Sequence, residues 1–151
     1  VTATVDSIPL ITSSIMGKKL ASGSRSIVLD VKCGSGAFMK TPSEAEALSR
    51  MMVDIGEKAG RRVAAVISDM DTPLGFGIGN ALEIKEAIDV LKGKDVSDLK
   101  EVCLTLAANI VKISKGITIE DARTKVEAAL SSGAAFQKFK EFIIQRTKEK
   151  K

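Results

Sequence analysis

The chain has 151 residues, 44% of them hydrophobic and 28% charged, which is typical of one globular domain with its own core. It contains no Trp, Tyr or His, so the core is aliphatic, and histidine-based zinc sites and catalytic triads are excluded. Few residues could stack on bases, and much of the net charge of +4 comes from the segment 148–151, so we expect no nucleic-acid partner.

The two cysteines, Cys33 and Cys103, are isolated and lack the spacing of a metal site. We interpret both as reduced thiols of a reducing compartment, and the helical apolar pattern around Cys103 predicts a core position for it. No apolar run is long enough to span a membrane and no signal peptide is visible, so we expect a cytoplasmic protein without a membrane partner. The first residue is Val1 rather than Met, which indicates a processed chain or a fragment.

The first predicted helix spans about residues 7–20. Ile11, Ser14 and Lys18 are spaced by three and four residues and therefore share one helix face. An apolar group, a hydroxyl and a cation on one face could grip a small polar ring that carries carbonyl oxygens. The alternative is an amphipathic helix whose lysine points to water, and spacing alone favours that alternative.

A short break at Ser22-Gly23-Ser24 is interpreted as a turn or hinge. The β-branched strand 27–33 then leads into the turn Gly34-Ser35-Gly36, after which Thr41 and Glu44 form a capping box at the start of a helix. Ligands of open α/β sheets bind at the carboxyl ends of strands, and glycines let the backbone approach a ligand closely. The turn is therefore a candidate binding loop, with a simple tight turn as the alternative.

The helix after this turn is predicted over residues 42–59, with a core stripe of Leu48, Met51, Met52 and Ile55. The second predicted strand, 62–68, is apolar enough to be buried on both faces. Strand, helix and strand at this spacing predict a parallel unit. The following loop, 69–80, has three glycines and two aspartates, and its main-chain carbonyls could bind a cation or belong to a plain ordered loop.

The rest of the chain reads as four helices. Asn80 is predicted to cap the first, and the others are expected at 97–114, 118–133 and 134–148. Two strands cannot form a covered parallel sheet by themselves. The predicted fold class is therefore α/β, as part of a larger parallel-sheet domain.

Nine runs of residues match the family of pyrimidine-nucleoside and thymidine phosphorylases in order and spacing. They are 1–12, Ser14-Ile15-Met16, Lys18-Lys19-Leu20, 28–32, 34–40 (GSGAFMK), Asp69-Met70, Pro73-Leu74-Gly75, 79–83 (GNALE) and Glu86-Ala87. The chain closely resembles that family over roughly its first two-thirds, while the helical remainder is less diagnostic.

The resemblance implies reversible phosphorolysis: phosphate, the co-substrate, and a pyrimidine (deoxy)nucleoside give the free base and a (deoxy)ribose 1-phosphate. Family members are homodimers with a small helical domain, a large α/β domain and an active-site cleft between them. On that basis residues 1–21 belong to the helical domain, 22–26 are a hinge and 27–151 are part of the α/β domain.

The resemblance also implies site residues. Ser14 and Lys18 match the residues that hydrogen-bond the pyrimidine edge, and Lys18 would act catalytically by stabilising negative charge on the departing base. Ile11 and Phe38 match apolar contacts to the base.

A monovalent cation, potassium, is implied at main-chain oxygens of Leu74 and Gly77 and the carboxylate of Glu86. The family's phosphate-binding residues find no match here and are expected before Val1, and the family's Gln-Gly-Gly-Asp run is absent after Gln145. We therefore expect a central fragment with base contacts but little or no activity alone. Alternatives are a non-catalytic paralogue that binds a pyrimidine or a full-length partner, a phosphorylase of nucleoside monophosphates such as AMP, and an unrelated α/β binding module.

Overall fold

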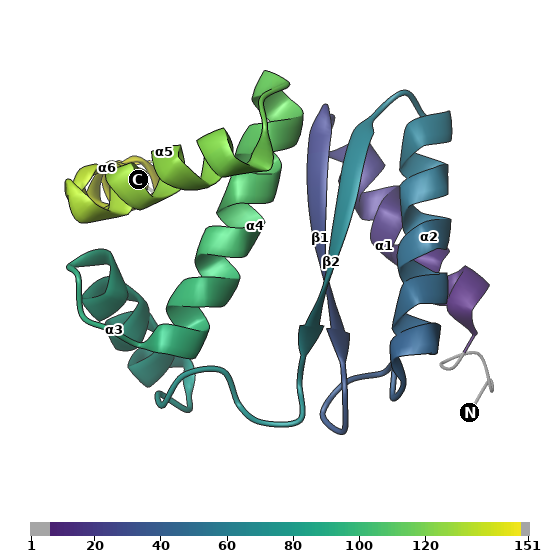
Figure 1. The fold of residues 1–151 in the computed structure, drawn as a ribbon, viewed down its shortest axis with the longest axis horizontal. Helices are drawn as coiled ribbons and strands as arrows, with labels where there is room; N and C mark the ends of the chain where they lie inside the picture. The colour runs from purple at the N-terminus through teal and green to yellow at the C-terminus, as the bar shows by residue number, and fades with distance from the viewer. Residues whose placement is uncertain (1–6, 149–151) are drawn as a thin grey trace. The chain divides into compact units, whose positions relative to one another are not determined.

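The structure is a computed structural model that describes residues 7–148. Its elements are, in chain order, α1 (Ile8–Ala21), β1 (Ser26–Cys33), α2 (Pro42–Lys58), β2 (Arg62–Asp69), α3 (Asn80–Leu91), α4 (Ser97–Lys115), α5 (Ile119–Ser131) and α6 (Ala134–Lys148) (Figure 1). The α/β fold class is confirmed, and every predicted helix and strand is present within a few residues of its expected bounds.

The chain divides into two compact units. The strand unit comprises Val1–Thr72 and Asn109–Thr118, and the helical unit comprises Pro73–Ala108 and Ile119–Lys151. The expected domain boundary at residues 22–26 concerns the whole protein and stays a prediction.

In the strand unit, β1 and β2 pair in parallel, from Ser26 opposite Arg62 to Cys33 opposite Asp69. Alternate residues of β1 point to opposite faces of the sheet, and Ile27, Leu29 and Val31 are the buried set. The helix α2 packs on both strands and α1 packs on α2, so both helices lie on the same side of the sheet (Figure 1). The core between these layers is aliphatic, as the composition predicts, and consists of Met16, Ile27, Leu29, Val31, Met39, Ala45, Leu48 and Met52.

The predicted capping box begins α2. Thr41 Oγ1 accepts a hydrogen bond from the amide of Glu44 (3.3 Å), and Glu44 Oε2 accepts one from the amide of Thr41 (3.0 Å). The amides of Thr41 and Lys40 also lower the pKa of Glu44, so its carboxylate stays charged beside the positive end of the helix. This local motif needs only two residues three positions apart, which is why the sequence predicts it correctly.

The prediction that β2 is buried on both faces is wrong. Its residues are only partly buried, and Ile67 has 44% of its surface exposed. Apolar composition indicates that a strand can be covered, but the layer that covers it must come from elsewhere. Ile67 lies opposite the buried Val31 and therefore on the same face of the sheet as the core. On that face Val63 and Ala65 pack against the core, while the end of β2 at Ile67 stays exposed.

Two predictions for the helical unit are also corrected. Cys103 is exposed rather than in the core, because the buried positions of α4 are Leu104 and Ala108, one residue further round the helix. The residue that caps α3 is Gly79 rather than Asn80, and no side chain provides the cap. Glu83 supports the start of the helix, because its Oε1 accepts a hydrogen bond from the Gly79 amide (3.0 Å).

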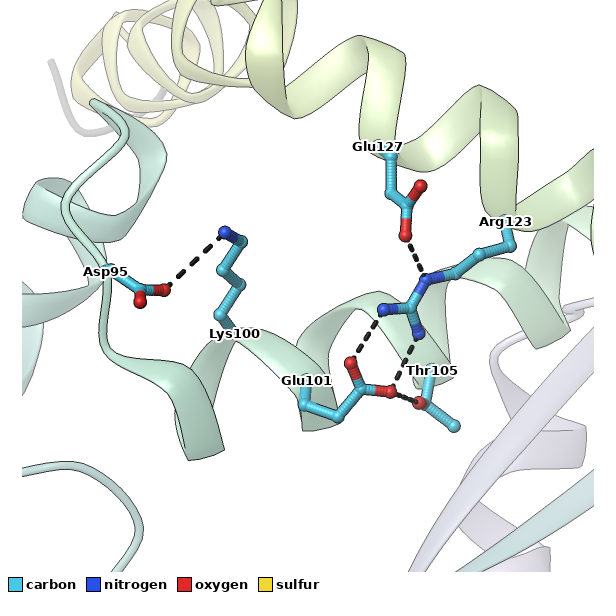
Figure 2. A network of polar contacts seen from close by, with 6 residues as sticks. All are labelled: Asp95, Lys100, Glu101, Thr105, Arg123 and Glu127. Carbon is cyan, nitrogen blue, oxygen red and sulfur yellow. Dashed lines mark hydrogen bonds and ion pairs between the residues drawn. The ribbon is translucent and has the colours of Figure 1, made fainter.

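The helical unit is held by a small core and by ion pairs. Its buried apolar residues are Val90, Val96, Leu104, Ala108 and Ala122, and α6 packs on α3 and α5. Figure 2 shows the guanidinium of Arg123, on α5, between Glu101 on α4 and Glu127 on its own helix. Among residues 7–148, no helix is long and apolar enough to cross a membrane.

Candidate functional site

The helix α1 carries three of the four predicted base-contact residues, and they differ in how far they are exposed. Ser14 and Lys18 are exposed and one turn apart, while Ile11 is half-buried and packs against the core of the strand unit. Thr12 and Met16, on the opposite side, are buried and anchor the helix. The hydroxyl and the ammonium group are therefore exposed to solvent, whereas Ile11 is partly covered by the core.

The loop 34–40, which follows β1, carries Phe38 with 74% of its surface exposed. The loop closes on itself through hydrogen bonds from the Gly34 amide to the Met39 carbonyl and from the Ala37 amide to the Gly34 carbonyl, each 3.0 Å. Lys40 Nζ donates to the carbonyl oxygen of Ser35 (2.8 Å). A large apolar ring is thus exposed on a loop whose backbone is closed by its own hydrogen bonds.

The glycines of this loop are close to protein rather than to open space. A Cβ on Gly34, whose φ is +133°, would lie 2.7 Å from Asp71 Oδ1, and one on Gly36 would lie 2.8 Å from the Met70 carbonyl oxygen. The close approach that the sequence assigned to a ligand is therefore made, at these two positions, by the loop that follows β2.

The second glycine loop, in the helical unit, is organised by Glu86. Its carboxylate accepts hydrogen bonds from the amides of Phe76 (3.0 Å) and Gly77 (3.0 Å), and Asp98 Oδ2 accepts one from the amide of Gly75 (2.8 Å). Both acidic side chains come later in the sequence than the loop, and together they accept hydrogen bonds from three consecutive backbone amides. Asp98 has a lowered pKa because the Gly75 amide donates to it.

The implied cation set can be tested against this geometry. Leu74 and Gly77 offer main-chain oxygens and Glu86 a carboxylate, and oxygen donors of this kind suit a hard cation. Glu86 already receives two amides, which use part of its accepting capacity, but a carboxylate has about four lone-pair sites. The residues present therefore fit such an ion. Among residues 7–148 there is no cluster of three or more His, Cys, Asp or Glu side chains that could hold a metal.

A pocket of about 900 Å³ lies in the helical unit, between α3, α4, α5 and α6, and none of the predicted site residues lines it. Five of its charged lining residues pair with one another: Arg123 with Glu101 and Glu127, and Lys100 with Asp95 (Figure 2). The other two are Lys94, which pairs with Asp89, and Lys92, which lies over the ring of Phe136. We interpret these contacts as support for the helices.

Comparison with known proteins decides the family. A family profile described as "Glycosyl transferase family, a/b domain" matches residues 1–136. The chain belongs to this glycosyl transferase family. Its a/b domain is the part of the family to which the parallel strands and their helices correspond.

Curated members of the family are closely similar. The chain is 56% identical over 144 residues to pyrimidine-nucleoside phosphorylases of Geobacillus stearothermophilus and Bacillus subtilis (strain 168), and 58% identical to that of Staphylococcus aureus (strain USA300). Each alignment covers 95% of this chain and 33% of the relative, so the chain spans about a third of the length of these phosphorylases. The resemblance on which the sequence analysis drew is confirmed.

Two groups of polar residues were missed by the sequence analysis. Asp71 accepts a hydrogen bond from the Ser35 amide (2.6 Å) across the two loops. On the sheet, Lys32 pairs with Asp30 (2.8 Å) and donates to Ser68 (2.9 Å), which faces Lys32 in the parallel register. The signal for the second group was available, because Asp30 and Lys32 alternate with the buried residues of β1 and so must share the other face.

Proposed function

We propose that this chain is the base-binding part of a phosphorylase of pyrimidine nucleosides. The observation that carries the proposal is the 56–58% identity to curated pyrimidine-nucleoside phosphorylases over 144 residues. The exposed positions of Ser14 and Lys18 on one side of α1 support it. Phosphate, the second substrate, is in this proposal bound by other parts of the protein.

In phosphorolysis the bond between sugar C1′ and pyrimidine N1 breaks, and its electron pair passes to the base. A phosphate oxygen forms the new bond to C1′. The departing base carries negative charge over its ring nitrogen and carbonyl oxygens. An ammonium group at that edge stabilises this charge more in the transition state than in the bound nucleoside, and we assign this role to Lys18.

The other site residues have supporting roles in the proposal. Ser14, one turn before Lys18, hydrogen-bonds the polar edge of the base, while Ile11 and Phe38 contact its apolar faces. Potassium held by Leu74, Gly77 and Glu86 would add a fixed positive charge and tie the loop 74–79 to α3. We also propose that the protein is cytoplasmic and that it forms a homodimer. Light scattering of the purified protein would test the homodimer.

The deciding experiment uses the gene product at the length at which its host makes it. With phosphate present, the protein should release thymine from thymidine or uracil from uridine. Lys18→Ala should lower kcat/KM by about 10²-fold or more, the usual effect of losing one group that stabilises transition-state charge. Lys19→Ala is the matched control, because Lys19 is also exposed on α1 but points from a different face.

Three results would change the assignment. Equal activity of Lys18→Ala and Lys19→Ala would remove Lys18 from the site. Release of base from a nucleoside 5′-monophosphate, with thymidine and uridine untouched, would favour the phosphorylase of nucleoside monophosphates. Binding of pyrimidine without any base release would favour the non-catalytic paralogue.

A further inference from the structure

The loops that follow the two strands are joined by main-chain hydrogen bonds. The amide of Met70 donates to the carbonyl of Cys33 (2.7 Å), and the amide of Gly36 donates to the carbonyl of Met70 (3.0 Å). These bonds continue the contact between β1 and β2 past the last pair of the ladder, Cys33 and Asp69. The position of the loop 34–40 is therefore set by Met70, which lies 34 positions after Gly36 in the chain.

One side chain adds a charged contact to this junction. Asp71 Oδ1 accepts a hydrogen bond from the amide of Ser35 at 2.6 Å, and Asp69 Oδ1 in turn accepts one from the amide of Asp71 at 3.0 Å. The hydrogen bonds from Ser35 lower the pKa of Asp71, so its carboxylate is ionised at neutral pH. A charged acceptor makes a stronger hydrogen bond than a neutral one.

Gly34, directly before Ser35, makes this contact possible. A Cβ at Gly34 would lie 2.7 Å from Asp71 Oδ1 and 2.9 Å from the Asp71 amide nitrogen, both closer than a real Cβ comes. The backbone of Gly34 also has a φ of +133°, which side chains with a Cβ rarely adopt. The Gly-Ser-Gly turn is thus shaped to receive Asp71.

We propose that Asp71 is a positioning residue for the pyrimidine base: it fixes the loop 34–40 so that Phe38 is presented to the base. This inference rests on the proposed function. Asp71 is proposed to make no contact with the base. It holds the amide of Ser35, three residues before Phe38, and so acts by fixing the loop. Because 74% of the surface of Phe38 is exposed, its position depends largely on the backbone that carries it.

The test compares Asp71→Ala and Asp71→Asn with the wild type, in the gene product at its natural length. Asp71→Ala should raise the KM for thymidine or uridine and the dissociation constant for free thymine by about tenfold, the value of one hydrogen bond to a charged group. The KM for phosphate and kcat should stay within about twofold, since such a change is under half a kcal/mol. Asp71→Asn keeps an oxygen acceptor without the charge and should lie between the two.

Hydrogen exchange provides a second readout that is independent of catalysis. Peptides that cover residues 34–40 should exchange faster in Asp71→Ala, while peptides from α2 exchange as in the wild type. Asp54→Ala is the matched control, because Asp54 is an exposed aspartate of α2 in the same unit. It should leave the loop exchange, the KM values and the affinity for thymine unchanged.

Three outcomes would overturn the inference: unchanged exchange of the loop in Asp71→Ala, faster exchange with unchanged nucleoside KM and thymine affinity, or equal losses in the KM for nucleoside and for phosphate. If the wild type cleaves no nucleoside, the proposed function fails, and the ratio of thymine affinities between Asp71→Ala and wild type still decides the role of Asp71. If the wild type also fails to bind thymine, the positioning role falls with the function.

Discussion

The strand unit and the helical unit are stabilised in different ways. The strand unit buries a continuous aliphatic core between its sheet and two helices, with Met52 only 2% exposed at its centre. The helical unit buries few large side chains and leaves several at its surface, such as Phe76 and Ile84 at 84% and 57% exposure. Its helices α4 and α5 are joined instead by two hydrogen bonds from the guanidinium group of Arg123 to the carboxylate of Glu101. The comparison shows that similar hydrophobic content can give unequal cores.

The largest effect is expected from a cavity in the strand unit. Met52→Ala should lower the free energy of unfolding by about 2–5 kcal/mol, because a buried methionine loses both transfer free energy and packing contacts. Urea denaturation measures the loss, and hydrogen exchange locates it. Met51→Ala, a half-buried neighbour on the same helix, is the control and should cost clearly less. Equal losses, or a loss confined to peptides of the helical unit, would contradict the assignment of the core.

A smaller effect is expected from the ion pairs of the helical unit. Arg123 donates through Nη1 and Nη2 to the two oxygens of Glu101 (2.8 and 2.6 Å) and through Nε to Glu127 (2.6 Å) (Figure 2). All three side chains are partly exposed, so Arg123→Ala should cost only about 1 kcal/mol in the same assay. Lys125→Ala removes an exposed cation from the same helix and should have no measurable effect. A loss as large as that of Met52→Ala would show that the comparison between the units is wrong.

The smallest effect is expected from acid. The hydrogen bonds from Arg123 and Thr105 lower the pKa of Glu101 from 4.5 to about 2. A carboxylate with a lowered pKa in the folded state stabilises the protein above its unfolded pKa, and this stabilisation disappears as pH falls toward the folded pKa. The difference in melting temperature between wild type and Glu101→Gln should therefore be constant above about pH 5 and shrink between pH 4.5 and 2. A difference that does not change with pH would exclude this ion pair as its source.

Local motifs of this chain could be predicted from the sequence, because they depend on neighbouring residues. The capping box of Thr41 and Glu44 is one example, and the shared face of Ser14 and Lys18 is another. Which side of a helix faces the core is harder to predict. The apolar pattern around Cys103 is present, but Leu104 is the buried residue and Cys103 is exposed. A rotation of about 100° per residue makes such a one-residue error large.

Contacts between distant residues could not be predicted. The hydrogen bond between Ser35 and Asp71 joins residues 36 positions apart. The carboxylate of Glu86 accepts hydrogen bonds from amides that are nine and ten positions before it. Nothing in the composition of either loop says which carboxylate will meet which amide. The sequence indicates two glycine loops with acidic residues nearby. Only the structure shows that the carboxylates of Asp71 and Glu86 accept hydrogen bonds from the amides of these loops.

The exposed ring of Phe38 also has an optical consequence. The chain contains neither Trp nor Tyr, so its own fluorescence is very weak. A Phe38→Trp substitution would place a single emitter, 74% exposed at the native ring, at the end of the loop 34–40. Its emission would have no background from other parts of this chain. The quenching of that emission by a stacked pyrimidine would make base binding visible in real time.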